Sequence, residues 1–258
     1  MRKRLAAALA ATLLLGVVPA PADTVSLESA YASYSALLEK YVTPRGVRYT
    51  AWRTSGDDLK SGSAVLAALR GADPNPLEPN ARKALWINLY NAKVLELVLV
   101  GNPKTSIREI SKGMNGNEIF DRKTILYQEK GMSLNDLEKK LRGEFKDPRV
   151  LFALDRAARS SPPLRSEAYE PAKLDEQLDE QVRTFLARPD ALDVKTVGGR
   201  PTLTVSKVFQ AFADDFKPAG GVGAFLAKYG PPEAAAAASS GKARLEFAEF
   251  DWGLNAAP

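Results

Sequence analysis

The sequence predicts an α+β fold: a single helix-rich domain with a buried central helix and a small, mainly antiparallel sheet. The central helix is predicted because residues 84–100 are apolar on every side at 100° per residue, which is typical of burial on several sides. The sheet is predicted because Gly198-Gly199 separates two strand-like runs, 192–197 and 202–205. With 258 residues, of which 45% are hydrophobic, the chain can bury a sizeable core. No repeat or linker divides residues 23–258, so we expect one domain.

Two asparagines interrupt the apolar surface of the central helix. Asn88 and Asn91 lie three apart, on neighbouring positions of one face. Because a buried unpaired amide is costly, we expect both to hydrogen bond to specific partners, and their loss to destabilise the fold. Alternatively, Asn88, Asn91 and Glu96 present polar groups to a ligand cleft. Lys93 and Glu96 inside the helix make it a poor membrane span.

The remaining elements follow from apolar spacing and from residues that begin or end helices. Residues 113–117 are expected to form turns, 217–223 to be flexible, and 231–241 to be the least regular segment. Helices are predicted over residues 27–42, 57–70, 106–110, 133–141, 174–186 and from 208 onward. Extended segments are predicted over residues 47–49, 124–127, 150–154 and 244–250, in addition to the hairpin.

The N-terminus has the pattern of a secretory signal peptide. Arg2, Lys3 and Arg4 precede an apolar run, and Ala20 and Ala22 follow it with the small-residue cleavage spacing. We expect residues 1–22 to be removed and the protein to be exported, to the periplasm or outside the cell. An uncleaved N-terminal anchor is the alternative. After cleavage, no stable membrane span is expected.

Composition excludes several classes of function. The chain contains no cysteine and no histidine, so thiol proteases, Ser-His-Asp hydrolases and His-built zinc sites are ruled out. Loss of the three basic N-terminal residues leaves 33 Lys and Arg against 31 Asp and Glu, a net charge of +2. No basic stripe with interleaved aromatic residues is present, so nucleic acid is not an expected partner. No metal site and no cofactor is expected, because neither a calcium loop nor a phosphate loop is found.

Several separated motifs occur in a characteristic order along nearly the whole mature chain. They are residues 46–49 (GVRY), 86–92 (WINLYNA), 106–110 (SIREI), 133–138 (SLNDLE), 147–150 (DPRV), 160–165 (SSPPLR), 209–216 and 250–255 (FDWGLN). This ordered set resembles the family known only as domain of unknown function 547. The resemblance implies an architecture and no particular reaction, because the activity of that family is not established.

The chain departs from the family at its Cys and His positions. The resemblance implies a histidine where Lys139 and Leu151 stand, a cysteine near Arg156, and a cysteine at Ser161. The thiol or metal chemistry that those residues suggest is therefore absent here, position by position.

The candidate catalytic groups are Ser161, Lys139 and Glu138. A serine with a desolvated lysine as its base could act as a nucleophile, and carboxylates such as Glu109, Glu138 and Asp251 could form a glycosidase-like pair. Alternatively, Ser161 is a turn residue before Pro162, Lys139 is a solvated helix lysine, and Asp251-Trp252 anchors the C-terminus.

The candidate ligand-binding groups are Asn88, Asn91, Glu96, Arg156, Arg159 and Arg165. Arginine guanidinium groups suit carboxylate or phosphate, although the same residues could form ordinary surface ion pairs. The interpretation that follows is an exported, non-catalytic binding or scaffold version of its family, with a small molecule or an envelope protein as partner. The alternative is a hydrolase or transferase that uses Ser161 with Lys139, or a carboxylate pair.

Overall fold

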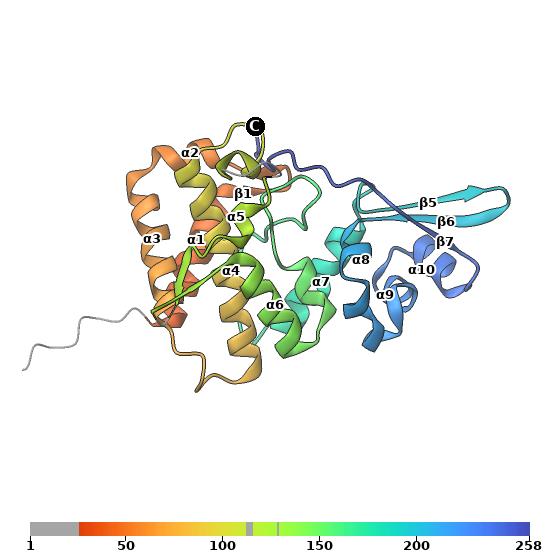
Figure 1. Cartoon of the computed structure of the whole chain (residues 1–258), viewed down its shortest axis with the longest axis horizontal. Coiled ribbons are helices and arrows are strands. Elements are labelled where there is room, and N and C mark those ends of the chain that lie inside the picture. The colour runs from red at the N-terminus through yellow and green to blue at the C-terminus, as the bar shows by residue number, and fades with distance from the viewer. Residues whose placement is uncertain (1–25, 112–115, 128) are drawn as a thin grey trace, which may run out of the picture.

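A computed structural model describes residues 26–111, 116–127 and 129–258 and confirms the α+β class. Figure 1 shows helices α1 to α4 packed at one end of the molecule and the long β5–β6 hairpin projecting at the other. The predicted signal peptide, residues 1–22, and residues 113–115 of the predicted turn lie outside the described residues.

Helices dominate the described chain. The α-helices are α1 (Leu27–Tyr41), α2 (Tyr49–Thr54), α3 (Gly56–Gly71), α4 (Pro79–Gly101), α5 (Glu118–Asp121), α6 (Leu134–Phe145), α7 (Leu174–Leu186), α8 (Val208–Ala211), α9 (Gly221–Tyr229) and α10 (Pro232–Ser239). The 3-10 helices are η1 (Ile107–Ile110), η2 (Pro148–Phe152) and η3 (Ala213–Ala219).

The strands form small sheets. They are β1 (Val42–Thr43), β2 (Gly46–Val47), β3 (Ile125–Tyr127), β4 (Lys130–Met132), β5 (Leu192–Val197), β6 (Arg200–Val205) and β7 (Arg244–Phe247). β1 pairs with β2, β3 with β4 and β5 with β6, all antiparallel, whereas β7 joins the far edge of β6 in parallel. The Gly198-Gly199 turn, with φ of 59° and 75°, closes the hairpin as predicted.

Helix α4 is the core helix that the apolar pattern predicts. Every residue from Lys83 to Leu95 is buried. By length and composition the 23-residue helix could cross a bilayer, but 72% of its apolar window is buried inside the protein. Its residues therefore pack against protein on several sides.

Asn88 and Asn91 of α4 each satisfy the backbone of a buried loop. Asn88 Nδ2 donates to Tyr169 O (2.8 Å), and Asn88 Oδ1 accepts from Tyr169 N (2.9 Å). Asn91 Nδ2 donates to Ala153 O (2.8 Å), and its Oδ1 accepts from Asp155 N (3.0 Å). The loop between η2 and α7 is thus bound to the central helix by both ends of each amide.

Two hydrophobic clusters form the interior. The larger lies around α1, α3, α4 and α6, and the smaller around α7, β5, β6 and α9. Helix η2 joins them, because Val150 belongs to the larger cluster while Leu151 and Phe152 belong to the smaller. Phe152 packs against the rings of Phe185, Phe209 and Phe225 at centroid distances of 5.4–5.5 Å.

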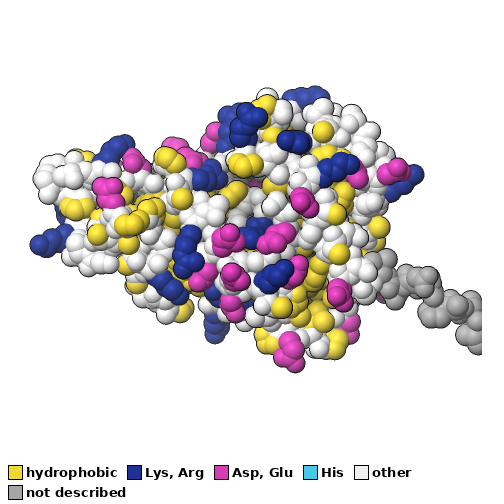
Figure 2. All heavy atoms as spheres, turned by 180° about the vertical axis from the view of Figure 1, so that it is seen from behind, with side chains coloured by type: hydrophobic (Ala, Val, Ile, Leu, Met, Phe, Trp, Pro, Cys, Tyr) yellow, Lys and Arg dark blue, Asp and Glu magenta, His cyan; other side chains and the backbone are white. Residues whose placement is uncertain are grey.

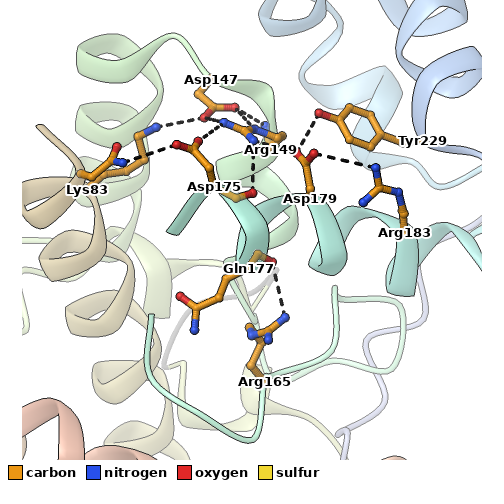
Figure 3. A network of polar contacts seen from close by, with 10 residues as sticks. Lys83, Asp147, Arg149, Arg165, Asp175, Gln177, Asp179, Arg183 and Tyr229 are labelled. Atoms are coloured by element: carbon orange, nitrogen blue, oxygen red, sulfur yellow. Dashed lines mark hydrogen bonds and ion pairs between the residues drawn. The ribbon is translucent and has the colours of Figure 1, made fainter. Parts of the chain in front are cut away.

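A polar network reinforces the same junction (Figure 3). Arg149 of η2 contacts Asp147 (2.9 Å) and reaches Asp175 and Asp179 of α7 (both 2.7 Å). Lys83 of α4 binds Asp147 (3.0 Å), and Tyr229 of α9 donates to Asp179 (2.9 Å). Burial opposes ionisation of Asp147, but Arg149 and Lys83 outweigh it and lower the pKa of Asp147. The network therefore ties four helical elements together.

Four local predictions need correction. Residues 150–154 do not form a strand, because Asp147 caps a 3-10 helix whose apolar residues face two clusters. Residues 217–219 end η3, which buried Phe216 anchors, and residues 221–223 begin α9, with Gly220 as a left-handed cap between the two helices. Residues 232–239 form α10, as proline at its start and a run of alanines favour. Tyr49 begins α2 instead of extending β2.

We predict that Asn91→Ala lowers the free energy of unfolding by about 1–3 kcal/mol, because Ala153 O and Asp155 N lose their buried partner. Asn88→Ala is expected to do the same through Tyr169. Chemical denaturation measures both, with the exposed Asn75→Ala as a control that stays within about 0.5 kcal/mol. Equal midpoints for all three variants would contradict the role assigned to the amides.

Candidate functional site

A cleft of about 590 Å³ opens between α6, the η2–α7 loop, α8 and the C-terminal residues. Its volume is in the range of small-molecule sites. Apolar and aromatic side chains make most of its wall, and a few charged groups converge on it. The lining residues are Arg108, Asn117, Glu138, Leu151, Leu154, Arg156, Ser161, Pro162, Lys207, Val208, Ala211, Phe212, Glu249, Phe250 and Trp252.

Glu138 and Arg156, two predicted candidates, form an ion pair on this wall. Glu138 is buried on α6, where Arg142 also approaches it at 3.6 Å. Arg142 in turn binds Asp215 of η3 at 2.7 Å and lies over the Phe212 ring at 4.5 Å. Glu138 is thus held by two arginines, and the charges at this end of the cleft are largely matched.

Two arginines bracket a pair of aromatic rings. The Arg108 guanidinium lies 4.1 Å from the Trp252 ring centroid, and that ring lies 5.9 Å from Phe120. The Arg156 guanidinium lies 5.1 Å from the Phe120 centroid. These cation–π contacts hold each guanidinium beside a ring while its N–H groups remain able to donate. Arg108 and Arg156 are therefore oriented groups, both on the wall of the cleft.

Ser161 lies on the same wall but is committed to a turn. It is 1% exposed, its Oγ accepts from Arg156 N (3.2 Å), and its N–H donates to Ala158 O (3.0 Å). Lys139 is exposed on α6 and does not line the cleft. Within the described chain Ser161 and Lys139 make no hydrogen bond with each other, although a Ser–Lys catalytic pair requires that contact.

The other candidates lie outside this cleft. Asn88 and Asn91 bind backbone, and Glu96 pairs with Lys93 beside a separate crevice of about 160 Å³. Arg165 pairs with Glu167 (2.7 Å) and Glu180 (2.8 Å). Arg159 is exposed, 3.6 Å from Asp251. Figure 2 shows acidic and basic side chains interspersed over the face that it draws, as such pairs produce.

The carboxylates Glu109 and Asp251 support local structure. Glu109 accepts from the hydroxyl of Thr105 and from the backbone N–H groups of residues 104–106, and these bonds lower its pKa to about 2. Asp251 Oδ1 accepts from Gly253 N (2.7 Å). Neither residue lines the cleft. The described residues also hold no group of three or more acidic side chains placed to bind a metal ion.

The C-terminal strap, residues 248–257, supplies one wall of the cleft through Glu249, Phe250 and Trp252. It is held by backbone bridges from Leu254 to Ala158 and from Ala256 to Val47. Gly46, at φ +117°, is required there, because an added Cβ would lie 2.1 Å from Asn255 O. The strap therefore closes over the first turn of the fold and over the irregular loop.

Buried Asp155 fastens this strap. Its carboxylate accepts from Asn255 Nδ2 (3.0 and 3.2 Å) and from Ala157 N (2.9 Å), and Tyr49 OH donates to Asn255 Oδ1 (2.8 Å). Burial raises the pKa of Asp155 to about 7, although the Asn255 and Ala157 bonds and the charge of Arg188 oppose the rise. Tyr34 and Tyr49, both buried near it, have raised pKa values chiefly because of their own burial.

Sequence reasoning found Glu138, Arg156 and Ser161 but missed much of the cleft. The fold brings together Arg108 of η1, the residues Lys207 and Phe212 that flank α8, and Phe250 and Trp252 of the strap. A signal was available for part of the set, since residues 106–110 and 250–255 belong to the ordered motifs.

Fold and site together define a helix-rich α+β protein with one wall of its ligand-sized cleft formed by its own C-terminus. Residues 74–186 match the family described as "Protein of unknown function, DUF547", and this part of the chain belongs to that family. The matched range includes α4, α6, η2 and the loop that carries Arg156 and Ser161. No curated protein and no solved structure gives a significant match.

We predict that Asp155 makes stability fall as pH rises from about 4 to 7. In this window the folded chain binds the Asp155 proton more tightly than the unfolded chain does, so the free energy of unfolding decreases by at most about 1.4 kcal/mol per pH unit. Denaturant titrations at pH 4.5, 5.5, 6.5 and 7.5 measure the effect. Asp155→Asn should remove this component and the exposed Asp57→Asn should retain it; parallel curves for wild type and Asp155→Asn would contradict the assignment.

Proposed function

We propose that this protein is a non-catalytic binding protein that takes a small organic molecule in the cleft. The supporting observation is the cleft itself, which is of ligand size, mostly apolar and furnished with a few oriented polar groups. Its charged side chains are already fixed by neighbours: Glu138 by arginines and Arg108 by Asn117 and Trp252. Because these side chains are ordered before binding, less side-chain conformational entropy is lost when a ligand binds.

The arrangement favours binding over the serine hydrolase alternative. Ser161 Oγ accepts a backbone hydrogen bond, and the wall beside it presents the guanidinium of Arg156 instead of a base. A nucleophile needs a base within hydrogen-bond reach, and Lys139 lies on the exposed side of α6. For a carboxylate pair, the cleft offers Glu138 and Glu249, but arginines engage the first and Lys207 binds the second at 3.1 Å. Both carboxylates have structural partners.

A neutral fluorescent probe tests the cleft without regard to charge. We expect N-phenyl-1-naphthylamine to bind wild-type protein with one-to-one stoichiometry and increased emission, because apolar side chains make most of the wall. Ala211→Trp fills the cleft from α8 and should weaken binding at least about fivefold, equivalent to about 1 kcal/mol.

The matched control for this experiment is Ala236→Trp, which places the same ring on exposed α10, away from the cleft. Its affinity should equal that of wild type. Absence of stoichiometric binding, or equal weakening by the two substitutions, would contradict the proposed function.

We also propose that the protein acts outside the cytoplasm, in the periplasm or beyond it. The support is the basic, apolar and small-residue pattern of residues 1–22. Expression of the full chain with intact-mass analysis of the exported fraction should give an N-terminus near Asp23. A cytoplasmic product that retains Met1 or Arg2 would contradict this proposal.

A further inference from the structure

We infer that the occupant of the cleft is an organic anion, a carboxylate or phosphate carried on a flat apolar body, and that Arg108 contacts its anionic group. This inference rests on the proposed function, since it names the chemical class of the ligand. Its basis is the charge balance of the wall and the geometry of Arg108.

The charges that line the cleft do not cancel. Arg156 is paired with Glu138, and Lys207 with Glu249. The third cation, Arg108, makes no ion pair with any carboxylate among the described residues. Among the described residues that line it, the wall therefore carries one positive charge without a paired carboxylate, next to apolar surface that weakens its screening by water.

The surroundings of Arg108 hold its guanidinium without neutralising it. Nε and Nη2 donate to the neutral amide oxygen Asn117 Oδ1 at 3.2 and 2.9 Å, and the guanidinium carbon lies 4.1 Å from the ring centroid of Trp252. Nη1 makes no hydrogen bond within the described part of the chain. An immobilised guanidinium with donors to spare is the group that best recognises a carboxylate or phosphate.

The rest of the wall fits the remainder of such a ligand. Phe212, Phe250 and Trp252 offer ring surface, while Leu151, Leu154 and Val208 offer aliphatic surface. A cationic ligand would find Glu138 already held by two arginines and Glu249 by Lys207. A neutral ligand of the same shape would bury the Arg108 charge without a counter-charge, which costs binding energy. A ligand with an anionic group on an apolar body would match both the apolar wall and the positive charge of Arg108.

A matched pair of ligands tests this inference. 2-Naphthoate and 2-naphthamide share one ring system and differ in charge, and each is titrated as a competitor of N-phenyl-1-naphthylamine. We expect wild-type protein to bind 2-naphthoate about tenfold more tightly, because only the carboxylate forms a charge-assisted bond with Arg108. Raising the salt concentration should weaken naphthoate binding and leave naphthamide binding unchanged.

Two substitutions test whether Arg108 causes the preference for 2-naphthoate over 2-naphthamide. Arg108→Gln should abolish the preference for naphthoate, whereas Arg45→Gln, an exposed position outside the cleft, should retain it. If Arg108→Gln does not fold, the salt dependence of wild-type naphthoate binding still tests whether the charge of the ligand contributes to affinity.

The possible failures are distinguishable. Equal and salt-independent affinities for the two naphthalenes would overturn the anion inference, and so would a preference that survives Arg108→Gln. Either result leaves the proposed function in place if the fluorescent probe still binds. Failure of the fluorescent probe to bind the cleft would overturn the proposed function itself.

Discussion

The fold depends on the hydrogen bonding of an irregular loop that is buried against the central helix. Between η2 and α7 the chain runs through residues 153–173 without a regular helix or strand, yet Ala153, Asp155, Ala168 and Tyr169 are buried. Each buried peptide group there needs a partner. Asn88 and Asn91 of α4 bind four of these peptide groups. Gln177 of α7 binds another, because its Nε2 donates to Ala168 O (2.9 Å). The loop, and with it Arg156 and Ser161, is positioned by side-chain amides.

The C-terminal strap supplies further hydrogen-bond partners to the backbone of this loop. Arg159 N donates to Gly253 O (2.8 Å) and Ser160 N to Asp251 O (3.2 Å), so the strap satisfies the outer side of the same loop. The strap also reaches the N-terminal turn, where Val47 N donates to Asn255 O (2.8 Å). Residues 46–49 and 250–255 are thus parts of one contact, with Asp155 buried beneath Asn255. The geometry of the cleft therefore depends on the contact between residues 46–49 and the C-terminal strap.

The sequence was sufficient for elements whose signal is local. The all-round apolar pattern of α4, the Ser133 cap of α6 and the Gly198-Gly199 hairpin are each determined within a few residues. The sequence was insufficient where contacts between distant parts of the chain determine the local conformation or the role of a residue. Residues 150–154 read as a strand because they are continuously apolar, but that pattern arises from a 3-10 helix between two clusters. Likewise, the roles of Arg108 and Trp252 follow from their contact across more than a hundred residues of chain.

Three of the positions at or near which the resemblance implies cysteine or histidine lie on the wall of the cleft. Leu151, Arg156 and Ser161, which stand at or near positions where the resemblance implies His or Cys, all line it. These positions are separated by up to ten residues, and the buried loop brings them to one wall. At that wall an aliphatic side chain, an ion-paired guanidinium and a hydroxyl that accepts a backbone bond stand where the resemblance implies reactive groups. A wall with these side chains retains shape, apolar surface and positive charge. Those are properties that bind a ligand, and none of them requires the ligand to react.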